Sequence, residues 1–162
     1  MVLAPPQPRF DVHPAREEDL AAAFTLAARE RDENPWIDRV PDILRNAVDG
    51  DGEYSACIAT QDGEIVGLGA FGMVAGTVGT AIVHGVIVAS HCRREGVGQK
   101  ILLYIATELS KAGARVIFAE VPGDPCMMRY RALLLAYGFI EEARIEDYYR
   151  DGIPQIISRL DR

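Results

Sequence analysis

Two periods of apolar positions alternate along the chain, and together they predict an α/β protein. Apolar residues recur at the three- to four-residue spacing of an amphipathic helix over residues 20–28 and 97–109. Other stretches are rich in β-branched residues and bounded by turn signals, which indicates strands; the clearest are 54–60, 65–74 and 80–89. The first two of these strands flank an Asp-Gly pair at residues 62–63, which is typical of a β-hairpin.

The complete pattern predicts the order β-α-α-β-β-β-α-β-α-β-β. The expected elements are a strand over 9–13, a helix that starts at Pro14–Asp19 and ends before Pro35, a helix over 41–48, strands over 54–60, 65–74 and 80–89, a helix from Gly96 to a cap at Gly113, a strand over 114–121, a helix over 127–137, and strands over 144–149 and 153–160. The strand–helix–strand segment 80–121 is long enough for a parallel crossover, whereas the hairpins are antiparallel. The central sheet should therefore be mixed and flanked by helices.

Composition bounds the classes of function. A chain of 162 residues with 49% hydrophobic and 25% charged residues can build one core, so we expect one domain over 9–162 after a flexible, proline-rich tail over 1–8. A net charge of −7 disfavours nucleic acid and anionic membranes as partners, and no apolar stretch approaches the ~20 residues that a bilayer requires. The three cysteines lack the spacing of a zinc site, and no leader segment is evident. We expect a cytoplasmic protein without a metal.

One glycine motif has the wrong surroundings for a nucleotide site. Residues 67–72 match G-x-G-x-x-G, but that fingerprint acts at a strand-to-helix turn with an acidic residue about 20 positions later. Here two more glycines follow, without helical spacing, and residues 86–92 contain no acidic residue. We expect these glycines to thin a strand where another part of the chain approaches.

A second glycine motif lies where a phosphate could bind. The strand ending at Val88 leads through a turn into Arg93-Arg94-Glu95-Gly96-Val97-Gly98, directly before the long helix. Unpaired amides at a helix N-terminus favour anions, and glycines permit close approach of a ligand. Residues 91–100 carry three Arg or Lys against one Glu, a local charge of 3 − 1 = +2 within an acidic chain. An ordinary turn with incidental arginines is the alternative.

These residues resemble the GNAT superfamily of acyl-CoA-dependent N-acetyltransferases. The signature Q/R-x-x-G-x-G/A is met by Arg93, Gly96 and Gly98, and the resemblance extends to the strand at 86–88, the Gly-Phe pair at 138–139 and the terminal hairpin. About four-fifths of the chain follows the family's order of elements. The resemblance implies a GNAT-like fold, with acetyl-CoA as the acyl donor.

The resemblance also implies where the donor lies. Its diphosphate would rest on the amides of residues 93–98, and its pantetheine arm would run beside the preceding strand, like an added strand. The implied cofactor-binding residues are Val86, Ile87, Val88, Arg93, Arg94, Glu95, Gly96, Val97, Gly98 and Gln99. The neighbouring parallel strand must then splay away, and Gly85 is compatible with a bulge at that point.

The chemistry of amine acetylation requires a base, because a lysine-like amine of pKa ~10.4 is mostly protonated at pH 7. His84 is the first candidate: family members often carry a Glu or His base on this strand. Even steps separate His84 from Val86 and Val88, so all three should face the same side of the sheet. A histidine satisfied within the sheet is the alternative, and Glu120 on the following strand is the reserve base.

The departing thiolate requires an acid, and here the chain differs from the family. The usual tyrosine, four residues before the Gly of Gly-Phe, is replaced by Leu134, and Met127 stands where the family has an asparagine. Tyr130 and Tyr137 share the helix face of Leu134. Either of these two tyrosines could replace the missing one. We take Tyr130 as the candidate general acid, with a core tyrosine and a water molecule as the alternatives.

The sequence therefore predicts direct transfer of an acetyl group from acetyl-CoA to a primary amine of a small molecule or peptide. Two alternatives stay open: a GNAT-like module that binds CoA without turnover, and an acyltransferase that uses a longer acyl chain. The acceptor cleft would include Trp36, Asp147, Tyr148 and Tyr149, which would suit a cationic amine. The sequence does not decide whether the chain forms a homodimer.

Overall fold

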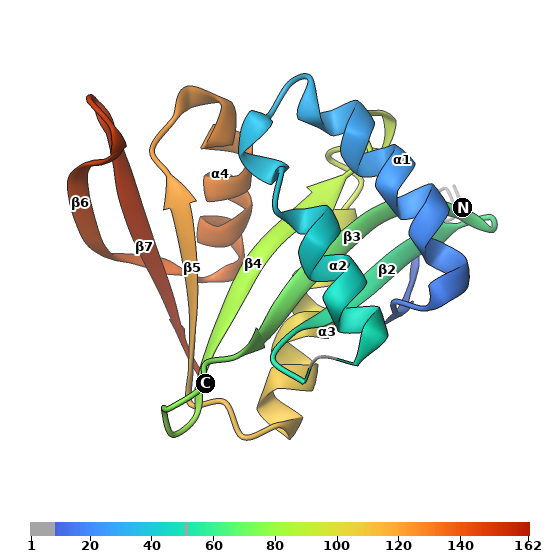
Figure 1. Cartoon of the computed structure of the whole chain (residues 1–162), viewed down its shortest axis with the longest axis horizontal. Coiled ribbons are helices and arrows are strands. Elements are labelled where there is room, and N and C mark those ends of the chain that lie inside the picture. Colours follow the sequence, from blue (N-terminus) through green and yellow to red (C-terminus); the bar gives the residue numbers. More distant parts are fainter. Residues whose placement is uncertain (1–8, 51) are drawn as a thin grey trace, which may run out of the picture.

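One mixed seven-stranded sheet organises the chain, as the computed structural model shows for residues 9–50 and 52–162 (Figure 1). The strands lie in the order β1-β2-β3-β4-β5-β7-β6, and only β4 and β5 are parallel. This confirms the predicted α/β fold class, the mixed sheet and the order of its elements. The expected tail over 1–8 lies outside the described residues.

The bounds of the elements are as follows. The strands are β1 (Asp11–Pro14), β2 (Ser55–Gln61), β3 (Glu64–Met73), β4 (Thr80–Val88), β5 (Val116–Pro122), β6 (Ile140–Arg150) and β7 (Ile153–Asp161). The helices are α1 (Leu20–Arg31), α2 (Val40–Asp49), α3 (Val97–Lys111) and α4 (Met128–Tyr137). Short 3₁₀ turns are η1 (Glu17–Asp19), η2 (Pro35–Ile37), η3 (Ser90–Cys92) and η4 (Pro125–Met127).

The start of the first helix differs from the prediction. Pro14 does not open the helix: it ends β1, opposite Cys57 of β2. The 3₁₀ turn η1 follows, and the backbone N–H of Arg16 donates to the carboxylate of Asp19 at 2.9 Å. Pro14 fits the edge strand because no partner there needs its missing N–H. The helix α1 begins only at Leu20, after the 3₁₀ turn.

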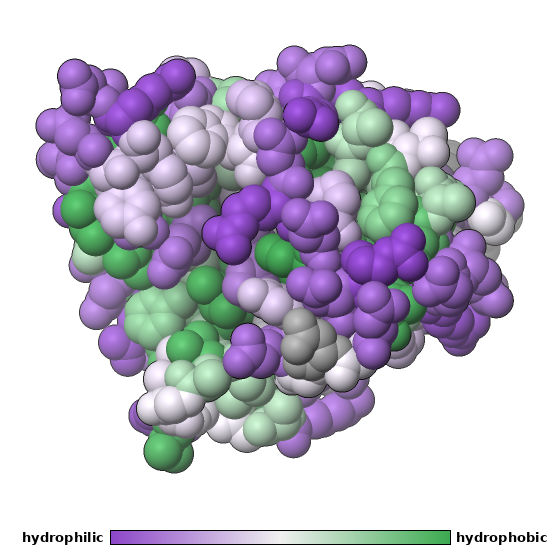
Figure 2. All heavy atoms as spheres, viewed as in Figure 1, coloured by the Kyte–Doolittle hydropathy of each residue, from purple (hydrophilic) through white to green (hydrophobic). Residues whose placement is uncertain are grey.

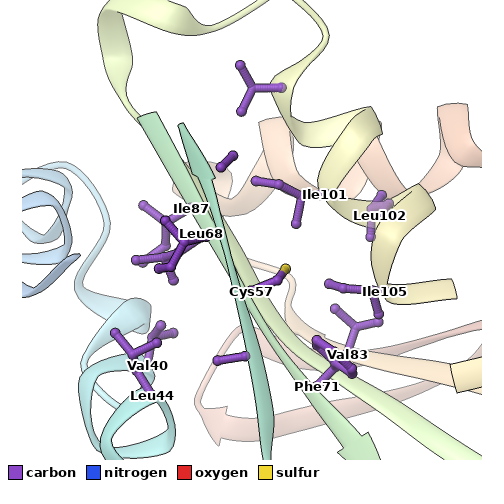
Figure 3. Close-up of a cluster of buried hydrophobic side chains, with 14 of the residues drawn as sticks. Val40, Leu44, Cys57, Leu68, Phe71, Val83, Ile87, Ile101, Leu102 and Ile105 are labelled. Carbon is purple, nitrogen blue, oxygen red and sulfur yellow. The ribbon is translucent and has the colours of Figure 1, made fainter. Parts of the chain in front are cut away.

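Helices cover both faces of the sheet. The helices α1 and α2 lie on the face nearer the viewer in Figure 1, and α3 lies behind it. Figure 3 shows Val40 and Leu44 of α2 near Leu68 and Ile87, whereas Ile101 and Ile105 of α3 lie on the other side of the strands. No helix lies in front of β5 and β7 in Figure 1, and apolar side chains reach the surface there in Figure 2.

The first glycine motif lies within β3, not at a strand-to-helix turn. A Cβ on Gly69 would lie 2.7 Å from Cγ2 of Ile101, and one on Gly72 would lie 2.1 Å from the backbone oxygen of Glu53. These glycines allow α3 and a neighbouring backbone segment to approach the strand closely, as the sequence predicted.

The parallel strands β4 and β5 stay paired over only half their length. Thr80–Val83 pairs with Val116–Ala119, and beyond that point no pairing joins the two strands, although β5 continues beside β7 as far as Pro122. Figure 1 shows the two strands diverging toward their carboxyl ends. A wedge thus opens beside residues 84–88 of β4.

A β-bulge in β4 accompanies this separation. Ala70 of β3 lies opposite Gly85, whereas the next residue, Phe71, lies opposite Val83, so His84 is the extra residue. Bulges bend a strand and redirect its side chains. The bulge falls at His84 and Gly85, as the glycine in this strand had suggested.

None of the described helices is both long and apolar enough to cross a membrane.

Candidate active site

A large pocket of about 1190 Å³ lies beside the end of β4, where β5 no longer pairs with that strand. Its walls come from the end of β4, the loop before α3, one face of α4, and the end of α1. All the cofactor residues that the resemblance implied line this pocket, except Glu95. The structure thus brings together side chains from four elements that are distant in the sequence.

The loop before α3 presents a row of amides with no internal partner. Gly96 adopts the left-handed conformation (φ 90°), and so does Arg94 (φ 66°), although non-glycine residues rarely do. No backbone carbonyl within residues 9–50 and 52–162 accepts a hydrogen bond from the N–H groups of residues 94–99. Such amides at the start of a 15-residue helix form a site for an anion.

The two glycines of this loop have different roles. A Cβ on Gly96 would meet nothing within 4 Å, so the glycine provides the positive φ and leaves open space above the helix end. A Cβ on Gly98 would lie 2.8 Å from Cδ2 of Leu133, so this glycine lets α4 pack closely on α3. The loop therefore lines one side of the pocket, and α4 lines the adjacent side.

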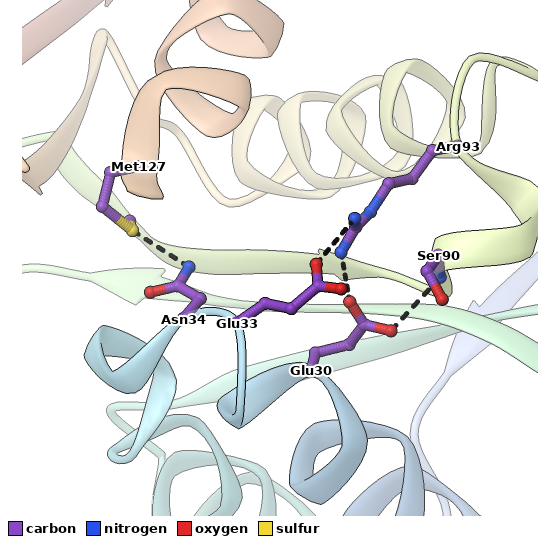
Figure 4. A network of polar contacts seen from close by, with 6 residues as sticks. All are labelled: Glu30, Glu33, Asn34, Ser90, Arg93 and Met127. Atoms are coloured by element: carbon purple, nitrogen blue, oxygen red, sulfur yellow. Dashed lines mark hydrogen bonds and ion pairs between the residues drawn. The ribbon is translucent and has the colours of Figure 1, made fainter. Parts of the chain in front are cut away.

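The Arg93 side chain does not face the pocket as a free cation. Its guanidinium forms an ion pair with Glu30, and it also bonds Glu33 at 3.1 Å (Figure 4). Glu30 is only 7% exposed and also accepts the backbone N–H of Ser90 at 3.2 Å. The end of α1 thus holds the turn that leads into the loop.

This network corrects the local charge sum made from the sequence. Lys100 is also committed, since its Nζ donates to the backbone oxygen of Phe10 at 3.1 Å. Glu30 approaches the loop from α1 and Glu33 from the turn that follows it, about 60 residues earlier in the chain. The sum over residues 91–100 counted neither the two acids nor the fact that two of its three cations have partners.

A second, smaller pocket of about 60 Å³ adjoins the first and contains the three candidate catalytic residues. His84, Glu120 and Tyr130 line it from β4, β5 and α4, together with Trp36, Ile37 and Val40. Tyr130 lines both pockets and marks the point where they meet.

His84 does not share a face with Val86 and Val88, contrary to the even-step argument. Val86 and Val88 lie opposite Gly69 and Gly67, whose side-chain positions face α3. A Cβ on Gly85 instead would lie 3.3 Å from Val40 of α2, and the extra residue at the bulge turns His84 toward that same side. The imidazole therefore faces the side of the sheet that α1 and α2 cover.

The surroundings of His84 favour its neutral form. Its ring centroid lies 5.4 Å from that of Tyr54, in a tilted arrangement. Burial lowers the pKa of His84 below its usual 6.5, and the nearby charge of Arg39 lowers it further. A neutral imidazole at pH 7 is able to accept a proton.

Tyr130 carries a buried hydroxyl that has no hydrogen-bond partner among the described residues. Burial raises the pKa of this phenol well above 10, so the hydroxyl keeps its proton. Burying a hydroxyl without a hydrogen-bond partner lowers the stability of a protein by about 1–3 kcal/mol. Native proteins contain few such groups, so this one is a candidate for a functional role.

Glu120 is more exposed, and one of its carboxylate oxygens accepts a hydrogen bond from Nε2 of Gln155 at 3.1 Å. Tyr149 lies beside the same group: burial raises the pKa of its phenol, and a hydrogen bond with Gln155 opposes this shift. The rings of Trp36 and Tyr149 pack edge to face at 5.0 Å, and Tyr148 packs on Tyr149 at 4.9 Å. Aromatic side chains thus adjoin the small pocket.

Sequence reasoning missed Asn34, which lines both pockets. Its Nδ2 lies 3.0 Å from Sδ of Met127, and its Oδ1 accepts the backbone N–H of Trp36 at 3.1 Å (Figure 4). An asparagine just before proline signals a helix cap, which it also forms here. Nothing in the local sequence indicates that its amide reaches Met127, at the position where the family carries an asparagine.

The cysteines offer no nucleophile. Cys92 is 2% exposed, and burial raises the pKa of its thiol. Cys126 borders the large pocket, but burial raises the pKa of its thiol to about 11, so it stays protonated at pH 7. Among the described residues, no group of three His, Cys, Asp or Glu side chains is placed to hold a metal ion.

Comparison with known proteins identifies the family. The model of the acetyltransferase (GNAT) family matches residues 17–126, and the chain therefore belongs to this family. No curated protein sequence matches the chain.

Solved structures share the fold at low identity. A GNAT-family protein from Desulfovibrio desulfuricans has a TM-score of 0.82 at 23% identity, covering 94% of this chain and 99% of that one. The ribosomal-protein-S18-alanine N-acetyltransferase of Escherichia coli has a TM-score of 0.70 at 21% identity, with 94% of each chain covered. A Salmonella typhimurium protein solved with acetyl-CoA has a TM-score of 0.76 at 17% identity, covering 94% and 93%.

We predict that Glu30 and Arg93 act as one unit that holds the loop. Glu30→Gln and Arg93→Gln should each destabilise the protein by about 1–3 kcal/mol, because each leaves a half-buried polar group without its charged partner. The double variant should lose little more than either single variant, which urea denaturation of all four proteins would measure. Glu33→Gln is the control: its side chain is 65% exposed, and its loss should stay below about 1 kcal/mol. Strictly additive losses would contradict the coupling.

Proposed function

We propose that the protein is an N-acetyltransferase that moves an acetyl group from acetyl-CoA directly to a primary amine of a small molecule or peptide. The observation that carries this proposal is the row of unpartnered amides at residues 94–99, which opens into a pocket that continues to His84 and Tyr130. A diphosphate suits the amides, and a narrow chain suits the wedge. The likeness to a protein solved with acetyl-CoA supports the choice of donor.

The donor would extend from the loop into the wedge. Its diphosphate would lie on the amides before α3, and its pantetheine arm along Val86–Val88, where β4 has no neighbour on the side of β5. A strand edge without a partner binds an extended ligand through its backbone groups. The thioester would then reach the junction of the two pockets, beside Tyr130.

The reaction needs one proton removed and one supplied. The amine nitrogen attacks the thioester carbonyl carbon, and the carbon–sulfur bond breaks as the amide forms. Bringing a lysine-like amine to its neutral form costs roughly 4–5 kcal/mol at pH 7, which a nearby base offsets. We assign His84 as this base, with Glu120 in reserve, and Tyr130 as the acid that protonates the departing thiolate.

The alternative is a CoA-binding module without turnover, which the replacement of the usual tyrosine by Leu134 favours. The two are separated by measuring thiol release from acetyl-CoA over a panel of amines and peptides, with a calorimetric titration of CoA alongside. We expect binding together with release for at least one amine. Binding without release for any amine would support the module, and faster release from a longer acyl thioester would revise the donor.

We predict that His84 governs the acid limb of the pH profile. The base must be neutral, and burial lowers the pKa of His84 below its usual value, so kcat/KM should stay high at pH 7 and fall only as the pH drops through that lowered pKa. His84→Gln should lower kcat/KM about 10²–10⁴-fold and remove this limb.

Glu120→Gln is the matched comparison for this profile, because it replaces the other candidate base by its isosteric amide. If the limb persists in His84→Gln and disappears in Glu120→Gln, the base is Glu120.

We predict that Tyr130→Phe makes the protein more stable and less active. Removing the unpartnered hydroxyl should raise the free energy of unfolding by about 1 kcal/mol or more, since the ring stays and a buried polar group is lost. Loss of the general acid should lower kcat about 10²-fold, with little change in the affinity for acetyl-CoA. Urea denaturation and initial rates measure the two effects.

Tyr137→Phe serves as the control for this substitution, because Tyr137 lies on the same helix and lines neither pocket. Full activity of Tyr130→Phe would remove the acid role and leave protonation to water.

A further inference from the structure

A carboxylate without a counter-cation lies in the small pocket. Glu120 of β5 lines this pocket, is exposed, and forms no ion pair with any of the described residues. Other acids near the two pockets have cationic partners: Asp124 pairs with Arg150 at 3.4 Å, and Glu30 pairs with Arg93. The negative charge of Glu120 is therefore available to a ligand.

A buried amide fixes the position of this carboxylate. Gln155 of β7 lies opposite Pro122 of β5, two residues from Glu120, so the side chains of Gln155 and Glu120 point to the same face of the sheet. Gln155 is only 5% exposed, and its Nε2 donates to Oε2 of Glu120 at 3.1 Å. An amide restrains the carboxylate without neutralising it. This face is open over β5 and β7 in Figure 1.

Aromatic rings lie beside the same carboxylate. Trp36 lines the small pocket with Glu120, and its ring packs on that of Tyr149 with 5.0 Å between centroids. Glu120 is also near Tyr149: burial is the main cause that raises the pKa of this phenol, and the charge of Glu120 adds to it. A carboxylate next to aromatic faces suits an organic cation, which gains both an ion pair and cation–π contacts.

The other walls of the small pocket are mainly apolar. Ile37, Val40 and Pro122 line it together with His84. A linker with hydroxyl groups would leave polar groups without partners against such walls, which is costly. The apolar walls therefore suit a hydrocarbon chain.

We propose that the acceptor is an aliphatic diamine whose second, protonated amino group binds Glu120 beside Trp36 and Tyr149. This inference deepens the proposed function and rests on it, with His84 as the base for the first amino group. An alkylammonium group of pKa ~10.4 is charged at pH 7, so the second amine presents a cation to the carboxylate. Only the reacting amine has to lose its proton.

Arg39 is the group that would favour a different acceptor. It lies exposed at the N-cap of α2 and has no ion-pair partner among the described residues, so it is available to a carboxylate on the acceptor. Its charge is close enough to His84 to add to the burial that lowers the pKa of the imidazole. Arg39 lines neither pocket, however, whereas Glu120 does. The geometry thus favours a second cation over an anion.

The test compares n-pentylamine, 1,5-diaminopentane and 6-aminohexanoate, whose far ends are apolar, cationic and anionic. Initial rates of thiol release from acetyl-CoA should give a kcat/KM for the diamine about 10–100-fold above that for pentylamine, mainly through a lower KM. Two equal amino groups account for only about twofold of this preference. The anionic amine should react no faster than pentylamine.

Glu120→Gln should reduce the preference for the diamine to about twofold, because the amide keeps the shape of the side chain and removes its charge. Tyr149→Leu should reduce the preference about two- to fivefold. Glu108→Gln is the matched control, because Glu108 lies on α3, borders neither pocket and pairs with Lys111 at 2.7 Å. It changes the net charge by the same amount and should keep the full preference.

The pH profile separates this role of Glu120 from that of a base. The acid limb of kcat/KM for the diamine should persist in Glu120→Gln, and its disappearance would make Glu120 the base and overturn the inference. Equal values for pentylamine and the diamine would also overturn it, as would a preference that Glu120→Gln leaves intact. A faster reaction of the anionic amine would overturn it in favour of Arg39. Absence of thiol release with every amine would contradict the proposed function itself.

Discussion

The separation of β4 from β5 is the constraint on which the candidate site depends. The two parallel strands share hydrogen bonds up to Val83 and Ala119 and separate beyond that point, next to the bulge that bends β4. On its other side, β5 stays paired with β7 as far as Pro122. Beyond Val83 the edge of β4 on the side of β5 would be costly in a closed core, because the backbone groups on that edge would lack partners. An extended ligand that enters the wedge would supply them.

The same bulge decides which side of the sheet carries the candidate base. Without the extra residue, His84 would point with Val86 and Val88 toward α3, into packed core. With it, the imidazole faces Trp36, Ile37 and Val40, beneath α2. A single inserted residue thus separates the proposed donor-lining positions of β4, Val86 and Val88, from the position of the proposed base. The sheet can therefore bring a donor and an acceptor together from two directions.

Local patterns predicted most of the helices and strands and also the loop before α3. Amphipathic spacing, Asp-Gly turns and glycine motifs each depend only on residues that are close in the sequence. What they could not predict is which distant group partners each charge. The local charge sum counted Arg93 as a free cation, but Glu30, 63 residues earlier, pairs with its guanidinium. The side of the sheet that His84 faces was predicted wrongly for a related reason. Alternation of side chains assumes a regular strand, and Gly85 indicated a bulge without showing that His84 is its extra residue. The place of Asn34 in both pockets had no local signal, since it depends on how α1 and α4 pack around the wedge.

The polar groups of the site divide into those that the fold satisfies and those that it leaves unsatisfied. Glu30, Arg93 and Lys100 have partners within the chain, so they shape the loop whether or not a ligand is present. The amides of residues 94–99 and the hydroxyl of Tyr130 have no partner among the described residues, and both belong to residues of the candidate site. Unsatisfied groups cost stability, and a fold retains them where a ligand supplies the missing partner. The proposed donor would need both kinds of group, because its diphosphate requires anion donors and its departing thiolate requires an uncharged proton donor.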